Sequence, residues 1–308
     1  MSVRYGPVTG LVLGLLVLAT AASASIEDQL SVYGEANAKG YLEPLVEAGG
    51  AALNLGLFES AYIPTDGWYV KLEFRGMGTW FKDDEKTFSA TTEDGFSPET
   101  TAEAPTVVGP GDAVEVEGDA ETRFFFPGGF DLGSFALATP QIRFGTVKGT
   151  EGLVRFVTAV LGDNELGDVQ LWGFGVRHSI SQYLDPDLGY NIAAGFMYSS
   201  FKAGENENGS DMFDVTAWTI CAQGSKIWRK GGAAVEPYVG LSLDSYSGNA
   251  EYKSEAGTTS MVDVNYDASY AFRASLGMLA SVQFVSGQIE YNLGSRSSIM
   301  FSLGFGKY

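Results

Sequence analysis

The stretch from Trp68 to Trp80 (WYVKLEFRGMGTW) constrains the fold of this chain more than any other part of the sequence. Side chains alternate between the two faces of a β-strand. One face of this stretch is apolar with a tryptophan at each end, and the other carries Lys71, Glu73 and Arg75. Strands of soluble proteins average about 5–6 residues, whereas a strand that crosses a membrane needs about 9–11. The pattern is therefore typical of a transmembrane β-barrel.

Similar alternating segments follow one another from Phe135 to the C-terminus, with turn residues between them. Counting them gives about ten strands, or about twelve if residues 51–62 and 121–126 also cross the membrane. We therefore predict an all-β fold, an antiparallel transmembrane β-barrel of about 12 strands (range about 10–14), with a short N-terminal luminal helix. A slip in the alternation near Trp218 predicts a β-bulge there. Long loops are expected at residues 83–121, 163–167, 203–211 and 247–265, on the outer side.

The N-terminus has the features of an export signal. Arg4 precedes an apolar segment, Leu11 to Ala19, which is too short to cross a membrane as a helix. The triplet ending at Ala24 fits a cleavage site, so residues 1–24 are predicted to be a signal peptide that is cleaved after Ala24.

Residues 25–50 have apolar residues at helical spacing. They are predicted to form a plug of two short helices, broken at Gly40 and Pro44. The barrel is then expected to occupy residues 51–308. A loosely ordered periplasmic tail is the alternative for residues 25–50, and residues 51–62 could continue the plug.

The composition excludes several classes of protein. The chain has 38 Asp and Glu against 19 Lys and Arg, which argues against a nucleic-acid partner. Cys221 is the only cysteine, so an exported chain of this length would have no internal disulfide. Closure of a hydrogen-bonded barrel can hold such a chain instead.

Several motifs resemble a family of Gram-negative outer-membrane barrels known as a domain of unknown function. They are Gly40-Tyr41-Leu42-Glu43-Pro44-Leu45, Ala138-Thr139-Pro140-Gln141 through Gly149-Thr150-Glu151, and Trp172-Gly173-Phe174-Gly175-Val176-Arg177-His178. The C-terminal FSLGFGKY resembles the strand read by the barrel-assembly machinery, although Gly306 replaces a large apolar residue. The layout is also similar to FadL-type transporters of hydrophobic compounds. The resemblance implies an outer-membrane location, with outer-membrane lipid and the assembly machinery as partners.

Charged residues on the predicted inward faces are the candidate lumen or substrate-path residues. They are Lys71, Glu73, Arg75, Arg143, Glu151, Arg155, Arg177, Glu236, Arg273 and Glu290, and Asp244 also falls on an inward face. A turn centred on Gly149 would place Arg143 opposite Arg155, and a similar count places Glu151 opposite Arg177. The set forms either a charge network in a polar lumen or a constriction that attracts anionic groups. In the second case Arg155→Ala would change ion selectivity.

No residue pattern predicts an enzyme, a cofactor or a metal centre. His178, the only histidine, falls on the lipid-facing set of its strand, which does not suit a general base. The acidic segment from Asp83 to Glu121 is expected to be a solvated surface loop, with divalent-cation binding as the alternative.

The expected function is passive passage of small, hydrophobic or amphiphilic molecules through an outer-membrane barrel, with a small-molecule solute as partner. The alternative is a structural or surface-interaction barrel with a closed lumen.

Overall fold

The structure is a computed structural model that describes residues 26–93, 95–145, 148–160, 168–185, 189–205, 211–254 and 260–306. The predicted signal peptide, its cleavage site and the terminal Tyr308 lie outside the described residues.

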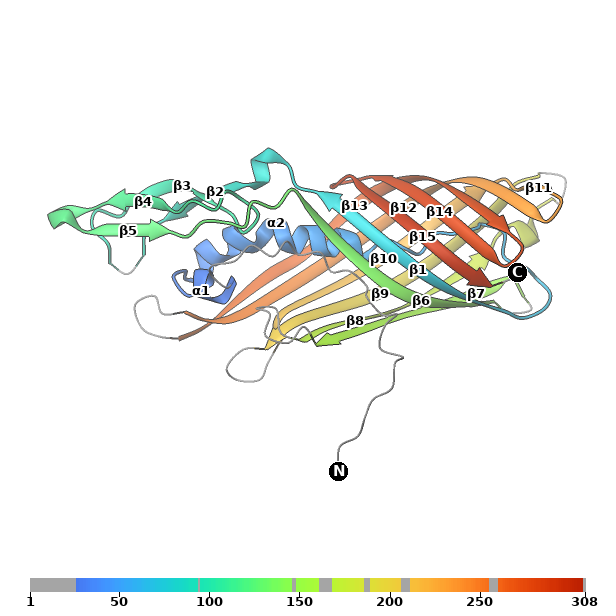
Figure 1. Ribbon diagram of the computed structural model, residues 1–308, viewed down its shortest axis with the longest axis horizontal. Helices are drawn as coiled ribbons and strands as arrows, with labels where there is room; N and C mark the ends of the chain where they lie inside the picture. The colour runs from blue at the N-terminus through green and yellow to red at the C-terminus, as the bar shows by residue number, and fades with distance from the viewer. Residues whose placement is uncertain are drawn as a thin grey trace, which may run out of the picture.

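Long antiparallel strands close into one ring (Figure 1). They are β1 (Tyr69–Trp80), β6 (Ser134–Gly145), β7 (Thr150–Val160), β8 (Asp168–Ser179), β9 (Asn191–Glu205), β10 (Asp211–Ser225), β12 (Ala233–Ser254), β13 (Ser260–Val282), β14 (Val285–Leu293) and β15 (Ser298–Gly306). The sheet has 11 strands, but β11 (Trp228–Lys230) pairs only with β12, so ten strands form the ring. Pairing of β1 with β15 and of β10 with β12 closes it.

The predicted count of about twelve crossing strands is too high for the described residues. Residues 51–53 end a helix, and residues 54–68 have no strand. Arg123–Phe126 is a four-residue strand, β5, that pairs with β4 in a separate small sheet. Neither additional segment is part of the ring, because residues 51–62 form no strand and Arg123–Phe126 pairs only with β4.

Two helices precede the barrel, α1 (Ile26–Leu30) and α2 (Glu35–Leu53). The predicted break at Gly40 and Pro44 is wrong, since α2 runs through both residues. Pro44 is buried, and packing offsets the one backbone hydrogen bond that a proline removes. At Gly40 an added Cβ would lie 2.4 Å from the Phe88 ring, so glycine allows a close contact there. Among the described residues, neither helix has the length and apolar character needed to cross a membrane.

The acidic segment folds into a small extension that we call the headpiece (residues 82–133). Its elements are η1 (Asp83–Glu85), β2 (Thr87–Thr91), β3 (Thr101–Pro105), β4 (Val114–Glu117), η2 (Asp119–Glu121) and β5. It packs on the helices instead of forming the predicted loop: the Val107 N–H donates to the Tyr41 carbonyl at 2.9 Å, and the Asn37 amide donates to the Thr91 carbonyl at 2.7 Å. Within the described ranges, no group of three acidic, histidine or cysteine side chains is arranged to hold a metal ion.

The two ends of the barrel differ. Gly306 and the connection between β13 and β14 lie at one end, the turn end, and the headpiece projects beyond the other, the headpiece end (Figure 1). The strands β12 and β13 extend through most of the loop predicted at residues 247–265. Their pairing shifts between Tyr246 and Gly248, whereas β10 keeps its register through Trp218, where a bulge was predicted.

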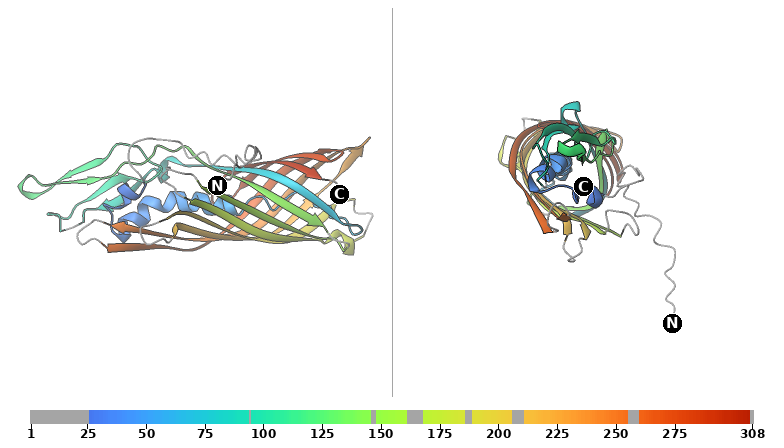
Figure 2. Two further views of the ribbon diagram at one scale, coloured as in Figure 1. Left: turned by 60° about the horizontal axis from the view of Figure 1, so that its bottom comes forward. Right: turned by 90° about the vertical axis from the view of Figure 1, so that its left-hand side faces the viewer.

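The N-terminal segment runs from the headpiece end toward the turn end. Near the first end, the Tyr252 hydroxyl donates to the Tyr33 carbonyl at 2.9 Å. Near the second, the Ser60 hydroxyl donates to Glu236 at 2.8 Å. The helix α2 contacts strands from around the ring, including β1, β6, β10, β12 and β13. Viewed along the barrel, the helices fall within the outline of the ring (Figure 2).

Candidate functional site

Twelve buried ionisable side chains gather on the inward faces of the strands and on the N-terminal segment, and we call them the interior charge cluster. The cations are Lys71, Arg75, Arg143, Arg155, Arg177 and Arg273, and the acids are Glu59, Glu73, Glu151, Glu236, Asp244 and Glu290; each is at most 9% exposed. All ten residues predicted from the sequence are in this cluster. The six positive and six negative charges balance, which reduces the cost of burying them.

Arg143 is central to the larger part of the cluster. Its Nε lies 3.1 Å from the Glu73 carboxylate, and its Nη1 pairs with Glu151. Glu151 also accepts from Arg177 at 2.6 Å, and Glu73 accepts from Arg75 at 3.0 Å. These contacts link four neighbouring strands, β1, β6, β7 and β8, through a single chain of ion pairs.

The predicted pairing of Arg143 with Arg155 is wrong, and the predicted pairing of Glu151 with Arg177 is confirmed. Arg143 lies opposite Leu153, and Arg155 lies opposite Gln141. The hairpin is centred one residue earlier than Gly149, which shifts the register by two residues. This register brings Arg143 beside Glu151, so like charges are not opposed.

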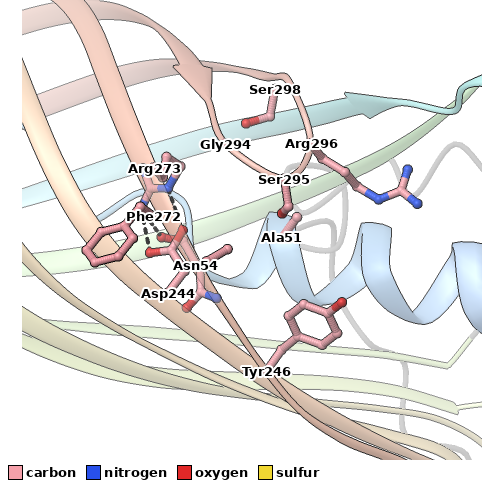
Figure 3. Close-up of a pocket in the computed structure, with 11 residues that line it drawn as sticks. Ala51, Asn54, Asp244, Tyr246, Phe272, Arg273, Gly294, Ser295, Arg296 and Ser298 are labelled. Atoms are coloured by element: carbon pink, nitrogen blue, oxygen red, sulfur yellow. Dashed lines mark hydrogen bonds and ion pairs between the residues drawn. The ribbon is translucent and has the colours of Figure 1, made fainter.

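A smaller group lies on β12, β13 and β14. Arg273 Nε donates to Asp244 at 2.7 Å, and the Tyr238 hydroxyl donates to Glu290 at 2.6 Å. Figure 3 shows Arg273 and Asp244 facing one another beside Asn54, just beyond the end of α2. A cavity here of about 20 Å³ has room for about one water molecule.

An irregular segment, residues 54–63, lies among these charges and has little backbone pairing of its own. Strand side chains bind its carbonyl oxygens instead, one after another. Arg273 donates to Asn54 (3.1 Å), Arg155 to Leu55 (3.0 Å), Gln141 to Gly56 (3.3 Å), Arg143 to Leu57 (3.2 Å), Arg75 and Gln288 to Phe58 (2.8 and 3.1 Å), Gln223 to Glu59, and Arg177 to Ser60 (2.6 Å). Seven strands thus satisfy buried carbonyls that a helix or sheet would otherwise satisfy.

Side chains of the irregular segment are held in the same way. The Glu59 carboxylate pairs with Lys71 and lies 3.2 Å from Arg143 Nε. At the turn end, Glu236 accepts from the Ser60 hydroxyl and from the Ala61 N–H at 3.1 Å. The segment is therefore bound by both charge pairs and backbone hydrogen bonds.

Arg155 differs from the other arginines of the cluster. Its guanidinium binds the carbonyls of Leu53 and Leu55 and the hydroxyl of Ser199. Within the described part of the chain it has no carboxylate partner, and its buried Nε has no hydrogen-bond partner. Arg155 therefore binds the N-terminal segment at the point where α2 ends.

A separate contact joins the headpiece to the barrel. Arg296, in the turn between β14 and β15, donates to Glu85 of the headpiece at 2.8 Å and to Glu47 of α2 at 2.9 Å. Its guanidinium lies over the Phe81 ring at 5.5 Å. This turn therefore links three parts of the chain at the headpiece end.

Glu59 and the three glutamines were not identified from the sequence. Gln141, Gln223 and Gln288 share inward faces with predicted charges, so alternation alone could have found them. Glu59 follows the apolar run Leu55–Phe58, where an acid is unusual, but residues 54–63 have no period that would have placed it.

His178 lies at the end of β8, where its ring contacts hydroxyl and amide groups. Nδ1 is 2.7 Å from the Thr150 hydroxyl, and Nε2 is 3.0 Å from the Tyr183 hydroxyl. Gln182 is the other neighbour of Nε2, at 2.8 Å. In the described residues no carboxylate orients this ring, as a general base of a catalytic triad would require.

Comparison with solved structures finds other β-barrels at low similarity. The beta domain of the Bordetella autotransporter BrkA is 12% identical, with a TM-score of 0.40, and the match covers 79% of this chain and 100% of that one. The translocator domain of the autotransporter NalP from Neisseria meningitidis is 12% identical, with a TM-score of 0.30 and coverage of 90% and 99%. A mutant of the monoaromatic hydrocarbon channel TodX is 9% identical, with a TM-score of 0.31 and coverage of 84% and 98%. These scores are too low to transfer an activity.

No curated protein matches this chain. The sequence profile of the Family of unknown function (DUF6588) matches residues 8–307, nearly the whole chain, and the chain therefore belongs to this family.

Proposed function

We propose that this chain is an outer-membrane β-barrel whose lumen is closed by its own N-terminal segment and whose ring anchors the headpiece at the cell surface. This proposal corresponds to the alternative function considered from the sequence, a structural or surface-interaction barrel with a closed lumen. The observation that carries it is the series of strand side chains bound to the carbonyls of residues 53–60. In this proposal the ten inward residues predicted from the sequence bind the chain itself and do not bind a passing solute.

The outer surface of the ring supports a membrane location. Leu241 is 68% exposed, Phe272 is 81% exposed and Leu276 is 63% exposed. A soluble protein rarely exposes so continuous an apolar surface. Trp68, at 74% exposed, lies near the turn end, as an interfacial aromatic residue would.

The orientation follows from the longest connection, the headpiece between β1 and β6, because such barrels carry their longer loops on the outer side. The turn end would then face the periplasm, and the headpiece would face the exterior. The last strand, β15, would be the one that the barrel-assembly machinery reads, and the outward apolar side chains would contact outer-membrane lipid.

The balance of charge also favours a closed lumen. A selective pore presents a ring of one sign to its water-filled path. Here six buried cations face six buried acids, and the guanidinium groups already hold carbonyl or carboxylate oxygens.

Single-channel recording in a planar bilayer tests this proposal. The full-length protein, shown to be folded by its heat-modifiable migration on a gel, is expected to produce no steady ion current. A sustained open-channel current from the folded protein would contradict the closed lumen and favour the channel alternative.

Passage of small hydrophobic or amphiphilic molecules is the second candidate function. One observation favours it: the headpiece half of the barrel has a group of buried, inward apolar side chains, beside the buried polar residues Thr79 and Ser298. They include Met77, Leu137, Val169, Leu171 and Ala217, all at most 3% exposed and in one cluster with α2. Such a region suits apolar molecules better than ions.

A further inference from the structure

The connection between β10 and β12 contains a short hairpin at the turn end. β11 pairs with the first residues of β12, where Trp228 lies opposite Val235. Gly231 and Gly232 form the two-residue turn of this hairpin, with φ of 59° and 81°, as a type I′ turn requires. The same part of β12 also pairs with the end of β13. Figure 1 shows β11 at the end of the molecule away from the headpiece, so the hairpin is a fixed part of that rim.

The two faces of β11 have different surroundings. Residues directly opposite one another across two strands lie on the same face. Val235 is outward and exposed, so Trp228 is outward as well, and alternation along β11 puts Lys230 on this face. Arg229 lies on the other face, where its guanidinium is 5.2 Å from the centre of the Tyr62 ring of the N-terminal segment. The outward face of β11 therefore carries a tryptophan and a lysine.

A second lysine lies two residues before Trp228. Nζ of Lys226 is 4.9 Å from the centre of the Tyr190 ring, and Tyr190 is 60% exposed just before β9 begins. A cation over the face of a tyrosine is held in place and keeps its charge. Lys226 and Lys230 are four residues apart, about 13 Å along an extended chain, and their side chains are long and flexible. Both ammonium groups can therefore approach one anionic group between them.

No acid neutralises these two lysines in the described part of the chain, where neither forms an ion pair with a carboxylate. The cations on the surface of the headpiece differ, because Lys82, Lys86 and Arg123 are each paired with an acid. The chain has 38 Asp and Glu against 19 Lys and Arg, so acids are plentiful. Two neighbouring cations without an acid therefore give the hairpin a local positive potential that suits an anion.

Exposed aromatic residues indicate the depth of the hairpin in the membrane. Trp228 is 56% exposed between the two lysines, and the exposed Trp68 lies at the same end of the barrel. Tryptophan and tyrosine favour the level where lipid headgroups meet hydrocarbon. Toward the headpiece, the outward face of β12 continues with the exposed apolar residues Val239 and Leu241. The two lysines are thus at the level of lipid phosphate groups, beside an apolar surface for acyl chains.

We propose that Lys226, Trp228 and Lys230, together with Tyr190, bind the headgroup of an anionic glycerophospholipid in the leaflet at the turn end. The two ammonium groups contact the phosphate oxygens, and Trp228 and Val235 contact the glycerol and the first part of the acyl chains. A membrane lipid fits better than free phosphate, because the apolar side of the site would have no partner in free phosphate. The inference requires a membrane location but does not depend on whether the lumen is closed.

Native mass spectrometry of the full-length protein tests the inference. The protein is titrated in detergent micelles with phosphatidylglycerol and, separately, with phosphatidylcholine of the same acyl chains. Phosphatidylglycerol is expected to remain bound at the lower lipid concentration, since only this lipid carries a net negative charge. Equal retention of the two lipids by the unmodified protein would overturn the proposal.

A double substitution locates the site. A lysine near the membrane surface contributes about fivefold to the affinity for an anionic lipid, so Lys226→Gln with Lys230→Gln should weaken phosphatidylglycerol binding about 30-fold. Binding of phosphatidylcholine should not change. The matched control, Lys82→Gln with Lys86→Gln, removes two lysines from the headpiece and should leave both lipids bound as before. An equal loss in the two double variants would contradict a site on the hairpin.

Competition with inorganic phosphate distinguishes the two sources of the anionic group. Excess phosphate should not displace phosphatidylglycerol, because it meets the two lysines but not Trp228 and the apolar surface. Displacement would show a site for free phosphate and contradict a lipid site. Heat-modifiable migration confirms that every variant is folded. An open-channel current, by contrast, would overturn the closed lumen without changing which lipid the protein retains.

Discussion

The Glu59 carboxylate lies 3.2 Å from Nε of Arg143 and ties the irregular N-terminal segment to the wall of the barrel. Both side chains are at most 2% exposed. Arg143 also binds the Leu57 carbonyl, so one arginine holds the segment by a charge pair and by its backbone. Glu59 is the only acid of the interior charge cluster that does not come from a strand.

The first prediction concerns this acid. Glu59→Gln removes one of six buried negative charges and leaves Lys71 and Arg143 with an excess of positive charge. Breaking a buried pair in this way costs about 3–5 kcal/mol of stability. The midpoint of the heat-induced change in gel mobility should therefore fall clearly.

Glu103→Gln is the matched control for that measurement, since Glu103 is exposed on β3 of the headpiece. A surface substitution of this kind should change the free energy of unfolding by no more than about 0.5 kcal/mol. Equal midpoints for the two variants would show that the Glu59 pair does not stabilise the barrel.

The strands and the inward charges could be predicted from the sequence because both depend on a local period of two. Lys71, Glu73 and Arg75 are buried as their alternation with Val70, Leu72 and Phe74 requires. Register depends on the turn between the strands. Because the turn is centred one residue earlier than predicted, Arg143 lies opposite Leu153 and not opposite Arg155.

The role of residues 54–63 could not be predicted in the same way. Their main partners are backbone carbonyls, which every residue carries, so the sequence does not distinguish them. The path of α2 was also missed, because a proline and a glycine are poor helix residues only when packing does not compensate. Pro44 is buried and Gly40 lies against Phe88, and both contacts depend on the tertiary structure.

The second prediction concerns a glycine that an aromatic ring covers. Gly277 lies directly opposite Tyr238 across β12 and β13, and an added Cβ would lie 2.1 Å from the tyrosine ring. Gly277→Ala should therefore destabilise the barrel by about 1–3 kcal/mol, as overpacking does. It should also displace the Tyr238 hydroxyl from Glu290.

Gly76→Ala is the control for this substitution, because an added Cβ at that strand position meets nothing within 4 Å. Removing a glycine from a strand there should be neutral or stabilising by up to about 1 kcal/mol. Urea unfolding of both variants in the same bilayer measures the difference, and an equal loss for both would refute the ring contact.

The third prediction concerns the link between the headpiece and the barrel. Arg296→Gln removes charge-assisted hydrogen bonds to Glu47 and Glu85, which together contribute about 1–3 kcal/mol locally. Hydrogen exchange of the α2 amides around Glu47 should become faster, while exchange in the turn-end half of the strands should not change.

Arg123→Gln tests whether any lost ion pair would have the same effect. Its pair with Glu115 is a surface pair, with side chains 57% and 38% exposed. Such pairs are worth about 0–1 kcal/mol, so exchange in α2 should stay as in the unmodified protein. Faster α2 exchange in both variants would mean that the Arg296 contacts are not specific.

The last prediction separates the helix from the irregular segment as the part that closes the lumen. Deleting residues 26–50 removes most of α2 but keeps the carbonyls that Arg155, Arg143, Arg75 and Arg177 bind, so the folded barrel should remain non-conducting. Deleting residues 26–63 removes these carbonyls together with Glu59. Six cations and five acids then face a hydrated lumen, and a current with a mild preference for anions is expected. The reversal potential in a salt gradient measures this preference, and heat-modifiable migration confirms that each barrel is folded. A folded barrel that lacks residues 26–63 and carries no current would contradict this account, as would a full current after the shorter deletion.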